Sequence, residues 1–175
     1  MDLFREMDMR LIKLFILISS IVFIHKNAFS LELKPVIDLS IAKKMADVCE
    51  AMRESKKWNP INIAIVDDGA DLVLFRRQDG AFLGSIDIAI RKATSSAMIP
   101  RSTRKVGELA YGEDGALGPR PGVATIDFLV PFAGGLPIRT ESGHLIGAIG
   151  VSGASSDQDE ECAQAAIDAV KHLLK

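Results

Sequence analysis

The sequence predicts an α/β (α+β) layered domain, an antiparallel five-stranded sheet with helices packed on it. The apolar patterns run in the order helix, strand, strand, helix, helix, long loop, three strands and helix. Neighbouring strand patterns are joined by short glycine-containing turns. Such hairpins favour an antiparallel sheet over a doubly wound parallel one.

A signal peptide is predicted over residues 1–30 of the 175-residue chain. Basic residues precede an apolar run over 11–24, and small residues follow at Ala28 and Ser30, in the order of a cleavable secretory signal. The run is shorter than the roughly 20 residues of a spanning helix, and an uncleaved anchor is the alternative. We therefore expect a domain over residues 31–175 that is secreted or periplasmic, with no stable membrane span after cleavage.

The charge of the chain argues against nucleic acid as a partner. The formal net charge is −2, and the basic clusters at 56–57 and 101–105 are short. Binding to phosphates needs a broad basic face, so solvated surface is the simpler interpretation of both clusters.

Two cysteines, Cys49 and Cys162, match no metal-ligand spacing. Each falls on the apolar stripe of a predicted helix, which is typical of buried free thiols. Outside the cytoplasm the same two residues could form a disulfide if both helices pack on one face of the sheet.

The first half of the domain is predicted as a helix followed by a hairpin. The helix is capped by Ser40 and ends near Lys57, and Asn59-Pro60 then breaks the chain. Strands are predicted over 61–66 and 71–77, with the turn between them at 67–70.

Two helices and a long loop occupy the middle of the sequence. A helix over 85–99 is stopped by Pro100, and a shorter helix through Ala110 is capped by Ser102 or Thr103. Residues 111–125 form a loop rich in glycine and proline, and a loop this long has either a binding role or high mobility.

The last third is predicted as a strand before Gly134-Gly135, a hairpin of strands over 136–140 and 144–151, and a final helix whose first turn holds acidic residues. Glycine inside an apolar strand costs stability. Another backbone or a ligand is therefore expected beside Gly147, Gly150 and Gly153.

The residues do not assemble a conventional catalytic site. No G-x-S-x-G elbow or phosphate-binding loop is present, and beyond residue 30 only His144 and His172 remain as histidines. We interpret His172 as a residue of the last helical turn and His144 as a strand-end residue with a possible site role. A glycine-rich strand, a proline-glycine loop and nearby cations suit a planar or anionic ligand. Whether the protein is an enzyme stays open.

Several segments in order resemble the GlcG/HbpS family, the haem-degrading domain family, which is similar to the C-terminal domain of PduO-type proteins. The matching segments are 64–73, 77–81, 91–94, 134–138, 147–153 and 158–159. The resemblance spans Leu39 to Lys175. It implies a profilin-like, GlcG-like layered domain that assembles into tetramers or octamers. It also implies haem binding by secreted members, whereas other members accompany glycolate or diol metabolism.

The resemblance to the haem-binding branch implies a threonine oxygen as iron ligand, and Thr103 is the matching position. A role for Thr103 as helix cap is the simpler alternative. Tyr111 and His144 are candidate ligands on chemical grounds.

The remaining candidates would hold the rest of a haem group. Arg101, Arg104 and Lys105 would pair with the propionates, and Gly150 and Gly153 would let the ring edge approach the backbone.

Three functions follow from these observations. The first is an exported haem-binding protein that sequesters haem or promotes its degradation. The second is an enzyme or accessory protein for a small hydroxy acid or aldehyde. The third is a non-catalytic homo-oligomeric assembly module. The first requires a pocket between the proline-rich loop and the small residues of the last strand.

Overall fold

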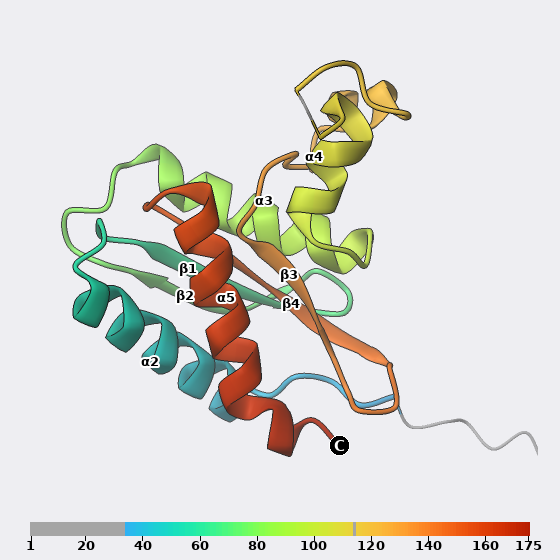
Figure 1. Cartoon of the computed structure of the whole chain (residues 1–175). Coiled ribbons are helices and arrows are strands. Elements are labelled where there is room, and N and C mark those ends of the chain that lie inside the picture. The colour runs from blue at the N-terminus through green and yellow to red at the C-terminus, as the bar shows by residue number, and fades with distance from the viewer. Residues whose placement is uncertain (1–33, 114) are drawn as a thin grey trace, which may run out of the picture. The chain divides into compact units, whose positions relative to one another are not determined.

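The computed structural model describes residues 34–113 and 115–175 (Figure 1). The predicted signal peptide lies outside these residues. Within them, no helix is long and apolar enough to cross a membrane.

The described chain forms a four-stranded antiparallel sheet with helices on both faces. The elements are α2 (Leu39–Lys56), β1 (Asn62–Asp67), β2 (Leu72–Arg77), α3 (Gly84–Met98), α4 (Thr103–Tyr111), η2 (Pro121–Thr125), β3 (Gly135–Arg139), β4 (Leu145–Ser152), α5 (Ser156–Val170) and η3 (Lys171–Leu173). The strand order is β2-β1-β4-β3, so β4 pairs with both β1 and β3.

Side chains along the central strands point alternately to the two faces of the sheet, so each face has its own core. Ile63 and Ile65 of β1 belong to the cluster that α2 and α5 complete, whereas Ala64 and Val66 face α3. Figure 1 shows α2 and α5 together on one face of the sheet and α3 on the other. The α3 side is made mostly of alanine, so this helix lies close to the sheet.

The prediction of five strands was wrong, because the segment before Gly134 is not a strand. Side chains of α3 satisfy its backbone instead. Ser95 Oγ donates to the carbonyl of Phe128 at 2.8 Å and accepts from the amide of Val130 at 2.9 Å. Arg91 donates to the carbonyl of Asp127. Pro131 has no N–H to donate to a neighbouring strand.

The helix caps follow from local hydrogen bonds. Asp38, not the predicted Ser40, caps α2, because its Oδ1 accepts from the amide of Ile41 at 2.8 Å; this hydrogen bond lowers the pKa of the Asp38 carboxyl. Ser102 rather than Thr103 caps α4. Ser155 and Gln158 form a capping box at the start of α5.

A disulfide joins the two helices that share one face of the sheet. Cys49 of α2 and Cys162 of α5 are both fully buried and bonded, with their Cα atoms 5.0 Å apart. Of the two alternatives that the sequence left open, the structure has the disulfide. It closes a loop of 113 residues, which restricts the unfolded chain strongly.

A buried ion pair joins α3 to α5 near the end of β4. Lys92 Nζ lies 2.9 Å from Asp159 Oδ2 and donates to the carbonyl of Val151 at 2.8 Å. Asp159 also accepts from the amide of Ala154 at 3.1 Å. Burial lowers the pKa of Lys92 and raises the pKa of Asp159, because each charged form loses its hydration.

Loss of the disulfide should destabilise the fold. We expect reduction, or the Cys49→Ala/Cys162→Ala variant, to lower the free energy of unfolding by about 2–5 kcal/mol, since the unfolded chain regains the entropy of an open loop. Urea unfolding with and without reductant measures this. The double variant should not respond to reductant. An equal stability of oxidised and reduced wild type would contradict the expectation.

Removing one partner of the buried pair should cost more than removing an exposed carboxylate of the same helix. Asp159→Asn is expected to lower the free energy of unfolding by about 3–5 kcal/mol, because it leaves the Lys92 ammonium buried without a counter-ion. Asp157→Asn, which breaks an exposed pair, should cost at most about 1 kcal/mol. Equal losses in urea unfolding would show that the buried pair has no special role.

Candidate functional site

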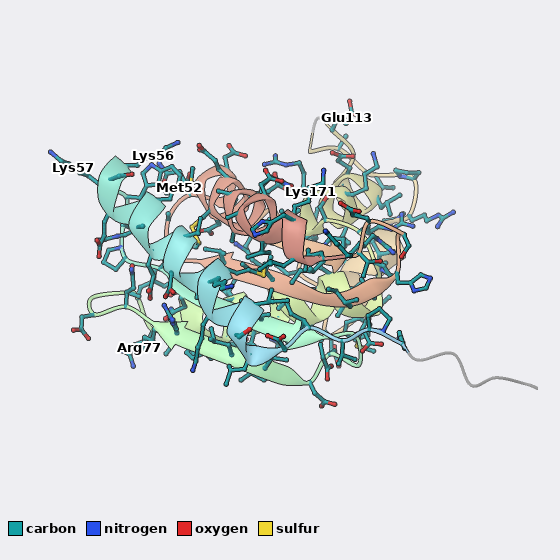
Figure 2. All side chains as sticks on the ribbon, turned by 90° about the horizontal axis from the view of Figure 1, so that it is seen from below. Met52, Lys56, Lys57, Arg77, Glu113 and Lys171 are labelled. Carbon is teal, nitrogen blue, oxygen red and sulfur yellow. A yellow bond between two sulfur atoms is a disulfide. The ribbon has the colours of Figure 1, made fainter. Side chains whose placement is uncertain are left out.

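A hollow of about 400 Å³ lies between α4, the chain that follows it and the segment before β3. It is lined by Arg104, Gly107, Glu108, Tyr111, Gly112, Glu113, Gly115, Pro131, Phe132, Ala133 and Ser156. It is open to solvent. Glu113 points away from the sheet at the outer edge of this region (Figure 2).

Glycines allow the walls of the hollow to approach closely. A Cβ at Gly107 would lie 2.4 Å from the carbonyl oxygen of Pro131, so only glycine lets α4 pack on the segment before β3. The chain after α4 turns back along the helix, where the amides of Gly118 and Arg120 donate to the carbonyls of Ala110 and Leu109. The described part of the long loop is therefore packed on α4 and contributes one side of the hollow.

Two aromatic side chains give the hollow an apolar surface. Tyr111 is 46% exposed and Phe132 is 41% exposed. Aromatic rings with this much accessible surface can stack on a flat ligand, and the Tyr111 phenol can donate, accept or bind a metal. Sequence reasoning selected Tyr111 but missed Phe132.

The cation at the hollow is already paired with carboxylates. Arg104 bonds to Asp157 at 2.5 Å and to Glu160 at 2.6 Å, and these hydrogen bonds raise its pKa. Lys105 pairs with Glu108, and this hydrogen bond raises the pKa of the lysine. Arg101 is exposed ahead of α4. An anionic ligand would compete with the carboxylates for Arg104 and Lys105.

Thr103 lies inside the fold rather than at the hollow. Thr103 is fully buried, and its Oγ1 accepts a hydrogen bond from the amide of Gly135 at 2.9 Å. In this arrangement Thr103 joins α4 to β3 and presents no surface to a ligand. Ser102 caps α4, so the helix-cap interpretation of Thr103 was wrong.

Other predicted contacts also lie away from the hollow. His144 is exposed in the turn between β3 and β4, at the Arg139 end of β3. A Cβ at Gly150 would meet the Ala89 carbonyl at 2.1 Å, and one at Gly153 would meet the Pro60 carbonyl at 2.3 Å. The protein's own backbone therefore fills the space in which a ring edge was expected.

Lys92 lies behind the aromatic wall of the hollow. Its Nζ is 5.0 Å from the centroid of the Phe132 ring, and the side chain is fully buried. Sequence reasoning missed this lysine. The signal was present, because Ala89, Lys92 and Ala93 recur at the spacing of one inward helix face.

A second hollow of about 510 Å³ runs along α5 and is acidic. Its carboxylates are Asp157, Glu160, Glu161 and Asp168. All four have partners already, since Arg104 bonds to the first two, Lys56 bonds to Glu161, and Gln164 donates a hydrogen bond to Asp168 at 2.9 Å. No group of three or more His, Cys, Asp or Glu residues able to hold a metal ion occurs in the part of the chain that the structure describes.

Known proteins share this fold and sequence. The family model described as haem degrading protein HbpS-like matches residues 37–168. Protein GlcG of Escherichia coli strain K12 is 31% identical over 121 residues, covering 69% of this chain and 85% of GlcG. The crystal structure of HbpS superposes with a TM-score of 0.70 at 26% identity, covering 81% of this chain and 94% of HbpS.

A solved complex of a further relative has the same fold. The crystal structure of a PduOC:haem complex superposes with a TM-score of 0.68 at 24% identity, covering 77% of this chain and 95% of the other. At that identity the likeness shows the shared fold. With the family model matched over most of the described residues and GlcG similar over more than two thirds of the chain, this protein belongs to the GlcG/HbpS family.

Proposed function

We propose that this protein binds haem in the hollow beside α4, outside the cytoplasm. The observation that carries the proposal is an open hollow whose walls present the rings of Tyr111 and Phe132. The family model that matches this chain is described as haem degrading protein HbpS-like, and a protein of the same fold has been crystallised with haem. Both facts favour haem over another planar anion.

The residues of the hollow fit the chemistry of a haem group. Tyr111 supplies a phenolic oxygen, a known ligand type for haem iron, and it is accessible where Thr103 is not. Phe132 supplies a ring for stacking. Arg104 could pair with a propionate by exchanging its present carboxylate partners. We therefore move the proposed iron ligand from Thr103 to Tyr111. Bound iron would supply any chemistry of haem breakdown, and the protein's residues would bind and orient the ring.

The export proposal has support from the disulfide between Cys49 and Cys162. Disulfides persist in oxidising compartments and are rare in the cytoplasm. Secretion or export to a periplasm, with a signal peptide over residues 1–30, therefore remains our proposal for localisation. Assembly into a tetramer or octamer also remains a proposal, and the exposed Leu83 and Leu117 are apolar surface that such contacts would cover.

Titration with haem tests the proposed ligand. Wild-type protein should give a saturable Soret shift at about one haem per chain, and Tyr111→Phe should change the spectrum and weaken affinity about tenfold or more, because it loses the iron–oxygen bond but keeps the ring. His144→Gln, at the far turn, should leave both unchanged. The proposal fails if wild type shows no saturable shift. Unchanged binding by Tyr111→Phe would remove Tyr111 as the ligand.

Thr103 should affect stability rather than haem binding. Thr103→Val is expected to lower the free energy of unfolding by about 1–3 kcal/mol, since the buried Gly135 amide loses its acceptor. Thr103→Ser, which keeps an oxygen, should cost less. Urea unfolding and haem titration of the same variants separate the two roles. A folded Thr103→Val protein that has lost haem binding would restore Thr103 as the ligand.

A further inference from the structure

The Lys92 amine is separated from the hollow by one aromatic ring. Two of its hydrogen-bond directions reach Asp159 Oδ2 and the Val151 carbonyl oxygen. The ring of Phe132 also lies beside the amine, with its centroid 5.0 Å from Nζ, and the backbone of Gly134 is close to Nζ as well. That ring is partly exposed and lines the hollow.

Phe132 belongs to a short strap, Pro131 to Ala133, held at its ends. On one side the Val130 amide bonds to Ser95 Oγ at 2.9 Å, and on the other the Gly134 carbonyl accepts from the Val151 amide at 2.9 Å. Between these points the described chain has no further backbone hydrogen bond. The backbone of the strap is hydrogen-bonded at its ends and packed on Gly107 at Pro131, and the exposed side chain of Phe132 can change rotamer without breaking these contacts.

Gly134, the residue after the strap, places no side chain over the amine. A Cβ at this position would lie 2.5 Å from Lys92 Nζ, and the residue has a φ of +121°, which side chains disfavour. Phe132 is therefore the cover that the strap provides over the amine.

We propose that Lys92 is a nucleophilic amine that forms a protonated imine with small carbonyl compounds entering the hollow when Phe132 moves aside. The hollow of about 400 Å³ has room for an aldehyde or an α-oxo acid of a few carbon atoms. This activity concerns the chain's own lysine and does not depend on haem.

Asp159 can move the protons that this reaction needs. It takes one from the ammonium, the free amine adds to the carbonyl carbon, and a proton passes from nitrogen to the new oxygen. Asp159 then returns its proton to the hydroxyl, which leaves as water, and a C=N⁺ bond remains. The sum is ammonium plus carbonyl compound giving protonated imine plus water. The product keeps its positive charge and one N–H, so the pair with Asp159 persists.

The surroundings of Lys92 make its neutral amine form more favourable than it is in a lysine exposed to water. Burial is the largest influence on Lys92 and lowers its pKa, while Asp159 and, at longer range, Glu160 of α5 oppose it. A lowered pKa increases the fraction of nucleophilic amine near neutral pH.

Reductive trapping on the full haem-free chain tests the proposal. The protein is incubated with propanal and cyanoborohydride at neutral pH to low conversion, then digested, and the propyl group is located by mass spectrometry. Lys92 should be modified at least about fivefold faster than Lys43, an exposed lysine of α2. Phe132→Ala should raise the Lys92 rate several-fold further. Phe128→Ala removes another ring from the segment between η2 and β3 and should leave the Lys92 rate unchanged.

Modification of Lys92 no faster than Lys43 in wild type overturns the proposal, because a purely structural lysine at this depth would react slowly. A fast wild-type rate that Phe132→Ala leaves unchanged overturns the role of the strap. Urea unfolding of both variants confirms that they are folded. Since no haem is present, failure of haem binding does not affect this result.

Discussion

The buried pair of Lys92 and Asp159 is the constraint on which the candidate site depends. It joins α3, on one face of the sheet, to the first turn of α5, on the other. The Val151 carbonyl at the end of β4 completes the cluster. Two charges removed from water are costly, and they persist only where each has a partner at short range. The arrangement of α3, β4 and α5 is therefore fixed next to the strap that carries Phe132.

The two faces of the sheet are held by different means. On the α2 and α5 face, large aliphatic residues and a disulfide between the helices form the main core. On the α3 face, alanines and Gly150 let a single helix approach until its backbone contacts the sheet. The close approach of α3 brings Lys92 and Ser95 against the connection that leads to β3. That connection, unable to be a strand, becomes a wall of the hollow.

This arrangement explains why several residues that the family resemblance predicted as haem contacts do not line the hollow. Glycines of β4 and the residue after it serve the packing of the protein's own backbone, and the oxygen of Thr103 serves the junction of α4 with β3. The exposed aromatic side chains lie elsewhere, with Tyr111 more than two turns farther along α4 and Phe132 across the hollow from it. The fold therefore agrees with membership of the family, whereas the candidate ligand contacts are the exposed side chains of Tyr111 and Phe132.

The sequence by itself determined the order of the helices, the two hairpins and the family, because apolar periodicity and turn residues act over a few neighbours. It indicated that something lies close to Gly150 and Gly153, since glycine in a strand has a local cost. Only the tertiary structure decided that the neighbour is backbone, that Cys49 and Cys162 are bonded, and that four strands form instead of five. Those outcomes depend on residues far apart in the chain, such as Ser95 with Val130. Their distances are set by packing, which no local pattern encodes.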